Sequence, residues 1–149
     1  AGGHLETLRW ARGKGCQWNE KTCTCAAREG HLECLKWARR QGCPWNEGTS
    51  RAAARGGHLH VLKYLRRQGC PWNEVTCDSA ARGGHLECLK WLRREGCPWL
   101  NAWASYEATK AGHQHVVDWI RSEECPSLRA DPRASLGLLR DGFVGMQLQ

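Results

Sequence analysis

Hydrophobic residues recur along the chain with the spacing of short amphipathic helices, each bounded by turn residues. Across residues 85–94, Leu86, Leu89 and Leu92 lie three positions apart, and Cys88 widens the apolar face. A face this broad needs contact with more than one neighbour. The pattern therefore predicts a short helix that packs against other helices on several sides.

A second kind of helical segment precedes each of these. Residues 73–82 begin with Asn73, whose side chain suits the N-cap of a helix, and they end in the small residues Ala80 and Ala81. Asparagine takes the same place at Asn19, Asn46 and Asn101. Gly84 then provides a residue that readily adopts the left-handed conformation closing a helix. The sequence thus predicts paired helices, a first and a second, joined by glycine turns.

The whole pattern repeats every 27 residues. Gly-His-Leu starts at Gly3, Gly30, Gly57 and Gly84, and a related Gly-His follows at Gly112 after one extra residue near Leu100. Cysteine keeps the same spacing, 27 residues and finally 28, at Cys16, Cys43, Cys70, Cys97 and Cys125. Aromatic residues form two more series, Trp18, Trp45, Trp72 and Trp99, and Trp10, Trp37, Tyr64, Trp91 and Trp119. Repetition this dense predicts a stack of similar units.

The period divides the chain into units and a tail. We expect a repeat domain over residues 1–126, with units at about 1–17 (partial), 18–44, 45–71, 72–98 and 99–126, followed by a divergent C-terminal tail over 127–149. A unit of two short helices cannot bury its own apolar face, so its stability depends on its neighbours. We therefore expect the chain to belong to a longer array.

The residues of one unit resemble the ankyrin repeat family. Residues 80–87 resemble the ankyrin segment Ala-Ala-x-x-Gly-His-Leu-Glu, and residues 96–99 stand where ankyrins have Gly-Ala-Asp-Val. The resemblance implies an all-α solenoid of stacked antiparallel helix pairs. Ankyrin repeats usually run about 33 residues, and the shortfall here lies between Asn73 and Thr76, where the family has its β-hairpin. We therefore predict little or no hairpin.

Histidine and cysteine residues raise the question of metal binding or disulfides. His4, His31, His58, His85 and His113 occupy one position per unit, where we expect hydrogen bonds to backbone. Equivalent atoms of neighbouring units lie on the order of 10 Å apart, too far to converge on one ion or to form a disulfide. We predict no metal, no cofactor, and reduced cysteines that fill the core along with most tryptophans.

The same observations bear on location. The chain shows neither a signal peptide nor a run of apolar residues long enough to cross a membrane. With reduced thiols, this predicts a cytoplasmic or nuclear protein that does not bind membranes.

Two surfaces are candidates for binding. In ankyrin proteins the first helix faces the concave groove that holds partners, and this resemblance implies a partner-binding face at Glu20, Arg28, Glu47, Arg55, Glu74, Arg82, Trp103 and Lys110. The helix dipole also explains acids at the start and bases at the end of these helices, so that alternative stays open.

The second surface is a basic ridge on the second helices, formed by Lys36, Arg40, Lys63, Arg67, Lys90 and Arg94. Such a ridge suits a phosphate backbone, but Glu33 and Glu87 interrupt it. Polyanion or nucleic-acid binding is therefore the alternative to protein binding.

Neither nucleophile motifs nor phosphate-binding glycine loops occur in the sequence, so we predict a protein without catalytic residues or a small-molecule substrate. The resemblance implies a protein–protein interaction scaffold instead. The net charge of +7 is compatible with an acidic partner.

Overall fold

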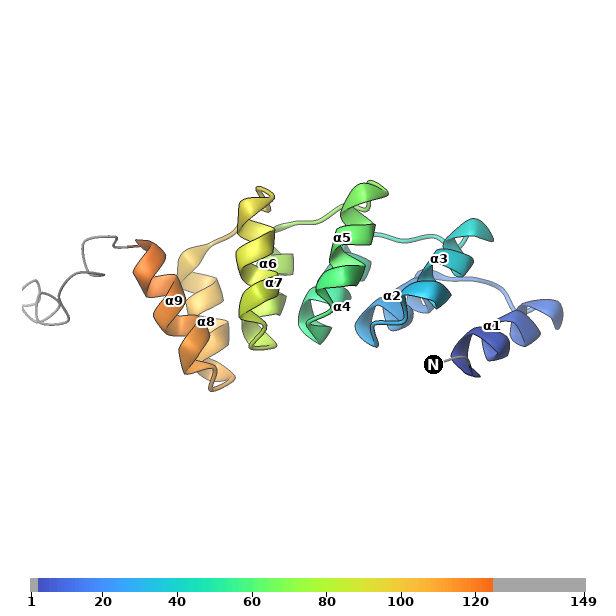
Figure 1. The fold of residues 1–149 in the computed structure, drawn as a ribbon, viewed down its shortest axis with the longest axis horizontal. Helices are drawn as coiled ribbons and strands as arrows, with labels where there is room; N and C mark the ends of the chain where they lie inside the picture. The colour runs from blue at the N-terminus through green and yellow to red at the C-terminus, as the bar shows by residue number, and fades with distance from the viewer. Residues whose placement is uncertain (1–2, 125–149) are drawn as a thin grey trace, which may run out of the picture.

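The computed structural model of the chain describes residues 3–124, and the predicted tail and Cys125 lie outside this part. Helices make up most of it (Figure 1). The first helices of the units are α2 (Glu20–Arg28), α4 (Glu47–Gly56), α6 (Glu74–Arg82) and α8 (Asn101–Lys110). The second helices are α1 (Gly3–Gly13), α3 (Leu32–Arg40), α5 (Leu59–Arg67), α7 (Leu86–Arg94) and α9 (Gln114–Glu124).

The helix pairs stand side by side in a single elongated row, with the second helices in one layer and the first helices behind them (Figure 1). Contacts are most extensive between successive first helices, from α2 through α8, and slight between successive second helices. The first-helix layer is therefore packed more closely than the second-helix layer. Residues 3–124 contain no strand, which confirms the predicted all-α solenoid without a hairpin.

The glycine turns adopt the predicted conformation. Gly30, Gly57 and Gly84 follow the first helices with φ between 74° and 76°, a left-handed backbone that disfavours side chains. Gly96 ends α7 in the same way, with φ 77°. Glycine at these positions therefore determines the conformation of the turns.

The asparagines cap their helices unequally. The Asn46 side chain accepts a hydrogen bond from the Gly48 N–H at 2.9 Å, as predicted. The Asn19 side chain makes no such bond. The prediction for Asn101 is wrong, because the extra residue Leu100 takes the N-cap position and Asn101 becomes the first residue of α8.

The core is a continuous layer of small and branched side chains. Alanines such as Ala27 and Ala53 are fully buried between the first helices, and their small size permits the close approach of those helices. Leucines such as Leu35, Leu62 and Leu89 fill the space between the helices of each pair. Neither helix of a pair buries these residues alone, so packing between units stabilises the fold.

Buried cysteines extend this core. The Sγ atoms of Cys43, Cys70 and Cys97 each lie 3.5 Å from the backbone carbonyl of the asparagine before the preceding first helix. Each thiol therefore connects the end of a unit to the start of the same unit, and the core prediction is confirmed for these three cysteines. It is wrong for Cys16 and Cys25, which are exposed.

The tryptophans pack at the edge of the core rather than inside it. Trp18 and Trp37 form an edge-to-face pair with ring centroids 5.6 Å apart, and Trp72 and Trp91 repeat it at 6.0 Å. All four are half-buried against the core. Core packing is wrong for Trp10, which is 66% exposed.

Arginines from the preceding second helix cover these indoles. The guanidiniums of Arg39, Arg66 and Arg93 lie 4.3, 4.3 and 4.4 Å from the ring centroids of Trp45, Trp72 and Trp99. Each such cation–π contact contributes about 0.5–1 kcal/mol at an exposed site. One arginine at the C-terminal end of each of these second helices thus packs against the next unit.

Histidines join each unit to the one before it. His58 Nε2 donates to the Arg28 carbonyl at 2.8 Å, and His85 Nε2 donates to the Arg55 carbonyl at 3.0 Å. Burial lowers the pKa of His85, which favours the neutral ring. The expected hydrogen bonds to backbone are confirmed at these two positions. The accepting carbonyls belong to the first helix of the preceding unit. That link between units was not predicted.

No helix in the described residues is both long and apolar enough to cross a membrane.

Candidate functional site

The first helices present one surface on which equivalent positions line up across the units. The last turn supplies a basic residue each time, in the order Arg28, Arg55, Arg82 and Lys110. Three positions on the same face vary in character. They are Lys21, Gly48, Val75 and Trp103; Thr24, Arg51, Asp78 and Tyr106; and Cys25, Ala52, Ser79 and Glu107. The surface therefore combines a constant basic row with changing chemistry beside it.

Four arginines on this surface line one pocket of about 220 Å³, here called the arginine pocket. Arg28 comes from α2, Arg51 and Arg55 from α4, and Arg82 from α6. Three of these arginines, Arg28, Arg55 and Arg82, were predicted as site residues, whereas Arg51 was missed. Arg51 lies four residues before Arg55, which places both on one face of α4, and this spacing was the available signal.

Small residues make the hollow between these arginines. Gly48 has no side chain to fill it, and Ala52 and Ser79 lie below with 6% and 8% exposure. Thr24 completes the lining on the α2 side. Long cationic side chains around a floor of small residues can surround an anion from several directions.

A second pocket of about 150 Å³, here called the acidic pocket, lies next along the surface between α6 and α8. Glu107 faces Arg82 there, with oxygen and nitrogen 3.5 Å apart. Asp78 is only 5% exposed, and its Oδ1 has no hydrogen-bond partner among the described residues. Burial first, and then the charges of Glu107 and Glu74, raise the pKa of Asp78 to about 6.

Two exposed aromatic residues adjoin the acidic pocket. Trp103 and Tyr106 of α8 are 55% and 51% exposed, and their ring centroids lie 5.4 Å apart. The Lys110 ammonium lies 5.8 Å from the Tyr106 ring. Trp103 was predicted as a site residue, whereas Tyr106 and Asp78 were missed. Exposed aromatic side chains of this kind are enriched in interface hot spots.

The predicted acidic residues lie at the other end of the first helices. Glu20, Glu47 and Glu74 are the first residues of α2, α4 and α6, about 12 Å along the axis from the arginines eight residues later. Glu20 accepts a hydrogen bond from the Asn46 side chain at 2.7 Å. The structure therefore separates the acidic row from the arginine pocket.

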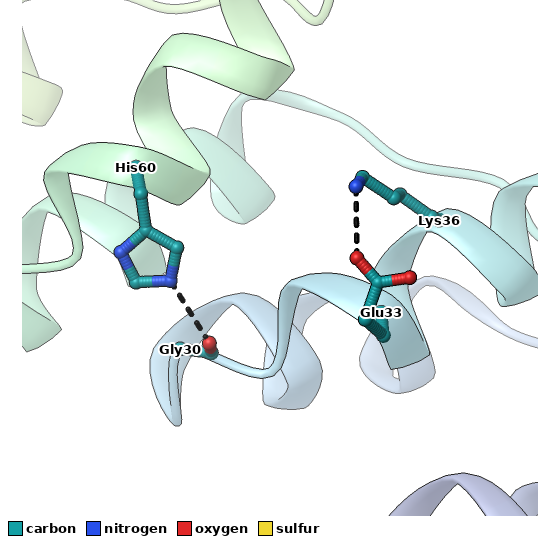
Figure 2. A network of polar contacts seen from close by, with 4 residues as sticks. All are labelled: Gly30, Glu33, Lys36 and His60. Atoms are coloured by element: carbon teal, nitrogen blue, oxygen red, sulfur yellow. Dashed lines mark hydrogen bonds and ion pairs between the residues drawn. The ribbon is translucent and has the colours of Figure 1, made fainter.

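The basic ridge of the second helices is partly neutralised (Figure 2). Lys36 forms an ion pair with Glu33 at 2.8 Å, and Lys90 does the same with Glu87 at 3.2 Å. The ridge arginines Arg40, Arg67 and Arg94 are exposed. Lys63 differs because His60 occupies the glutamate position, and His60 Nε2 donates to the Gly30 carbonyl at 3.2 Å (Figure 2).

A more apolar pocket of about 670 Å³ lies on α2, on the side that faces away from α4. Thr22 and Cys25 line it and are accessible there. Their counterparts Thr49, Thr76 and Ala52 are buried because another first helix packs on them. The pocket is thus the uncovered side of the first-helix stack, which explains the exposure of Cys25.

Metal-binding groups do not gather in residues 3–124, where no three histidine, cysteine or acidic side chains lie together as an ion requires. Cys88 and Cys70 are poor nucleophiles, since burial raises the pKa of Cys88 to about 11 and that of Cys70 above its usual value.

Repeated helix pairs sharing one core, with a single continuous surface of first helices, define a helical repeat protein of the solenoid class. A family model described as ankyrin repeats (many copies) matches residues 51–93. The matched residues therefore carry ankyrin repeats, as the sequence led us to expect. No curated protein matches it.

Proposed function

We propose that the protein is a protein–protein interaction scaffold that binds its partner on the first-helix surface. Ankyrin repeats are generally protein-interaction scaffolds. One observation supports this surface as the binding site. The arginine pocket, the acidic pocket and the exposed pair Trp103 and Tyr106 lie next to one another on it. We also propose a role without catalysis, as is typical of the ankyrin repeat family.

The rigid row and the variable surface have separate roles in this proposal. Core alanines, leucines and cysteines repeat from unit to unit, while Gly48, Val75 and Trp103 differ at one equivalent surface position. A constant framework with changing surface residues allows recognition without loss of the fold. The positive charge of the arginines favours an acidic segment of the partner.

Reversal of two surface charges tests the proposal. The variant Arg55→Glu/Arg82→Glu should lose most of the proteins captured from a lysate by the unmodified chain, because two cations of the arginine pocket become anions. Quantitative mass spectrometry of the captured proteins measures the loss. Both side chains are exposed, so circular dichroism should show an unchanged helix content.

The matched control is Arg67→Glu/Arg94→Glu, which reverses two exposed arginines on the second helices. Equal capture by the first variant and the unmodified chain would contradict the proposal. If only the control lost its partners, the basic ridge would be the binding surface.

A further inference from the structure

The arginine pocket holds positive charge that the described chain does not balance. Arg28, Arg51 and Arg55 form no ion pair or side-chain hydrogen bond with any residue in the range 3–124. Arg82 faces Glu107 at 3.5 Å, through a side chain that stays half exposed. Like charges held around one pocket repel, so an anion bound among them would relieve that repulsion.

The floor of the pocket supplies a further hydrogen-bonding group. Ser79 is 8% exposed and lines both the arginine and the acidic pockets. Its hydroxyl has no partner among the described residues, in contrast to the Thr24 hydroxyl, which donates to the Glu20 carbonyl at 2.8 Å. The Ser79 oxygen stays accessible to the pocket, so a ligand or a water there can accept its proton.

We propose that the arginine pocket binds the phosphate group of a phosphorylated side chain in a segment of a partner protein. A phosphate presents three oxygens and a charge of about −1.5 to −2 at neutral pH, against two oxygens and one charge for a carboxylate. It can therefore accept hydrogen bonds from several arginines at once, some of them bidentate. This proposal names the partner chemistry of the surface and rests on the proposed function.

The size of the pocket agrees with this ligand. Its volume of about 220 Å³ exceeds many times the 10–15 Å³ or so that one water requires. A phosphate group together with the first atoms of its side chain fits in such a space. Phosphorylated segments are recognised by arginine clusters in several unrelated domains, which shows that this chemistry suffices for binding.

The surroundings favour a protein segment over a nucleic acid. The arginines come from α2, α4 and α6 alone, and the acidic pocket with Asp78 and Glu107 follows directly on the α8 side. A polyphosphate backbone that continued along the surface would meet these carboxylates. A peptide with one phosphate and neutral neighbours would not, and its next residues could contact Trp103 and Tyr106.

Binding of synthetic peptides tests the proposal. The probes are a short glycine–alanine peptide with one central phosphothreonine, and the same peptide with threonine or glutamate in that place. Dissociation constants come from isothermal titration, and the Nε–Hε signals of the arginines come from two-dimensional NMR. We expect the phosphothreonine peptide to bind about tenfold more tightly than the glutamate peptide and to shift the signals of Arg51 and Arg55.

Variants separate the pocket from general charge. Arg51→Gln and Arg55→Gln should each weaken binding of the phosphothreonine peptide about tenfold. The matched variants Arg67→Gln and Arg94→Gln remove exposed arginines from the second helices and should leave it unchanged. No binding of the phosphothreonine peptide at millimolar concentration would overturn the proposal, as would equal binding of the glutamate peptide.

A single-stranded oligothymidylate serves as the competing probe. Binding of this oligonucleotide that weakened equally in both sets of variants, with no preference for the phosphopeptide, would assign the charge to general polyanion binding and overturn the proposal. The failure of this inference is distinguishable from that of the proposed function. If proteins captured from a lysate still depended on Arg55 and Arg82 while the phosphopeptide did not bind, the scaffold would stand and only the phosphate specificity would fall.

Discussion

Asp78 lies in an unusual environment for a charged side chain on a surface helix. It occupies the position that Thr24 and Arg51 take in the preceding units, yet it is nearly buried beside Glu107. A carboxyl with a raised pKa resists ionisation, so at neutral pH it lowers the stability of the fold. Such a cost at a surface pocket is typical of a residue kept for binding rather than for stability.

The variant Asp78→Asn tests this cost. The unfolded carboxyl ionises near pH 4 and the folded one near pH 6. Stability from this group is therefore present below pH 4 and lost as the pH rises through 6, a loss on the order of 3 kcal/mol. We expect Asp78→Asn to be more stable than the unmodified chain at pH 7.5 and similar at pH 4, as measured by urea unfolding.

The control for this comparison is Asp118→Asn, an exposed carboxylate that accepts a hydrogen bond from the Gln114 side chain at 2.8 Å. It should not gain stability at high pH. A difference between Asp78→Asn and the unmodified chain that did not change with pH would contradict the assignment.

Thiol accessibility distinguishes the cysteines at the same scale. Cys25 and Cys16 are exposed, whereas Cys43, Cys77 and Cys97 are buried within the shared core. Under native conditions we expect iodoacetamide to label the two exposed thiols at least tenfold faster than the buried ones, because labelling of the latter requires local opening. Peptide mapping by mass spectrometry gives the rates, and rapid native labelling of Cys97 would contradict the packed core.

At the scale of elements, neighbouring units are joined by a histidine whose ring packs against a glycine of the preceding unit. A Cβ atom added to Gly57 would lie 2.5 Å from Nδ1 of His85, the ring that donates to the Arg55 carbonyl. The ring of each later unit thus rests where the earlier unit has no side chain. Glycine at this place is required twice, by its positive φ and by the ring above it.

Alanine substitutions separate these two requirements. Gly57→Ala and Gly69→Ala both place a side chain at a positive φ, 76° and 73°, but nothing lies within 4 Å of an added Cβ at Gly69. We expect Gly69→Ala to cost about 1–2 kcal/mol from backbone strain. Gly57→Ala should cost about 2 kcal/mol more, since the His85 ring must move and its hydrogen bond is lost. Equal losses in chemical denaturation would show that the ring does not join the units.

For the whole molecule, the first-helix surface changes character along the row, from the arginine pocket through the acidic pocket to Trp103 and Tyr106 on α8. A partner that follows the row would meet basic, acidic and aromatic chemistry in that order. Extended surfaces of this kind give solenoids their specificity, because each unit contributes a few residues to a long contact.

The aromatic pair offers a test at this scale that leaves the charges intact. Trp103→Ala/Tyr106→Ala should weaken capture of partners at least tenfold, as expected for loss of exposed interface anchors. Trp10→Ala, on α1, removes a comparably exposed indole from a second helix and should have little effect. Biolayer interferometry with a captured partner measures both, and equal effects would contradict a first-helix interface.

Much of this architecture was accessible from the sequence. The 27-residue spacing of Gly-His-Leu, cysteine and tryptophan determined the paired helices, their order and the absence of a hairpin from the described units, because each unit must bury its apolar face on the next. The same repeat spacing also revealed the basic residue that ends each first helix. Position within a repeat is a property of the sequence alone.

What only the tertiary structure decided depends on contacts between units. Arg51 joined three predicted arginines because α2, α4 and α6 lie close enough for their side chains to share one pocket. Asp78 became buried through its position beside α8, and Trp10 and Cys25 became exposed where no helix covers them. Spacing along a chain states which residues share a helix face. Burial, charge balance and pocket shape arise from which faces meet, and these follow only when the helices are packed together.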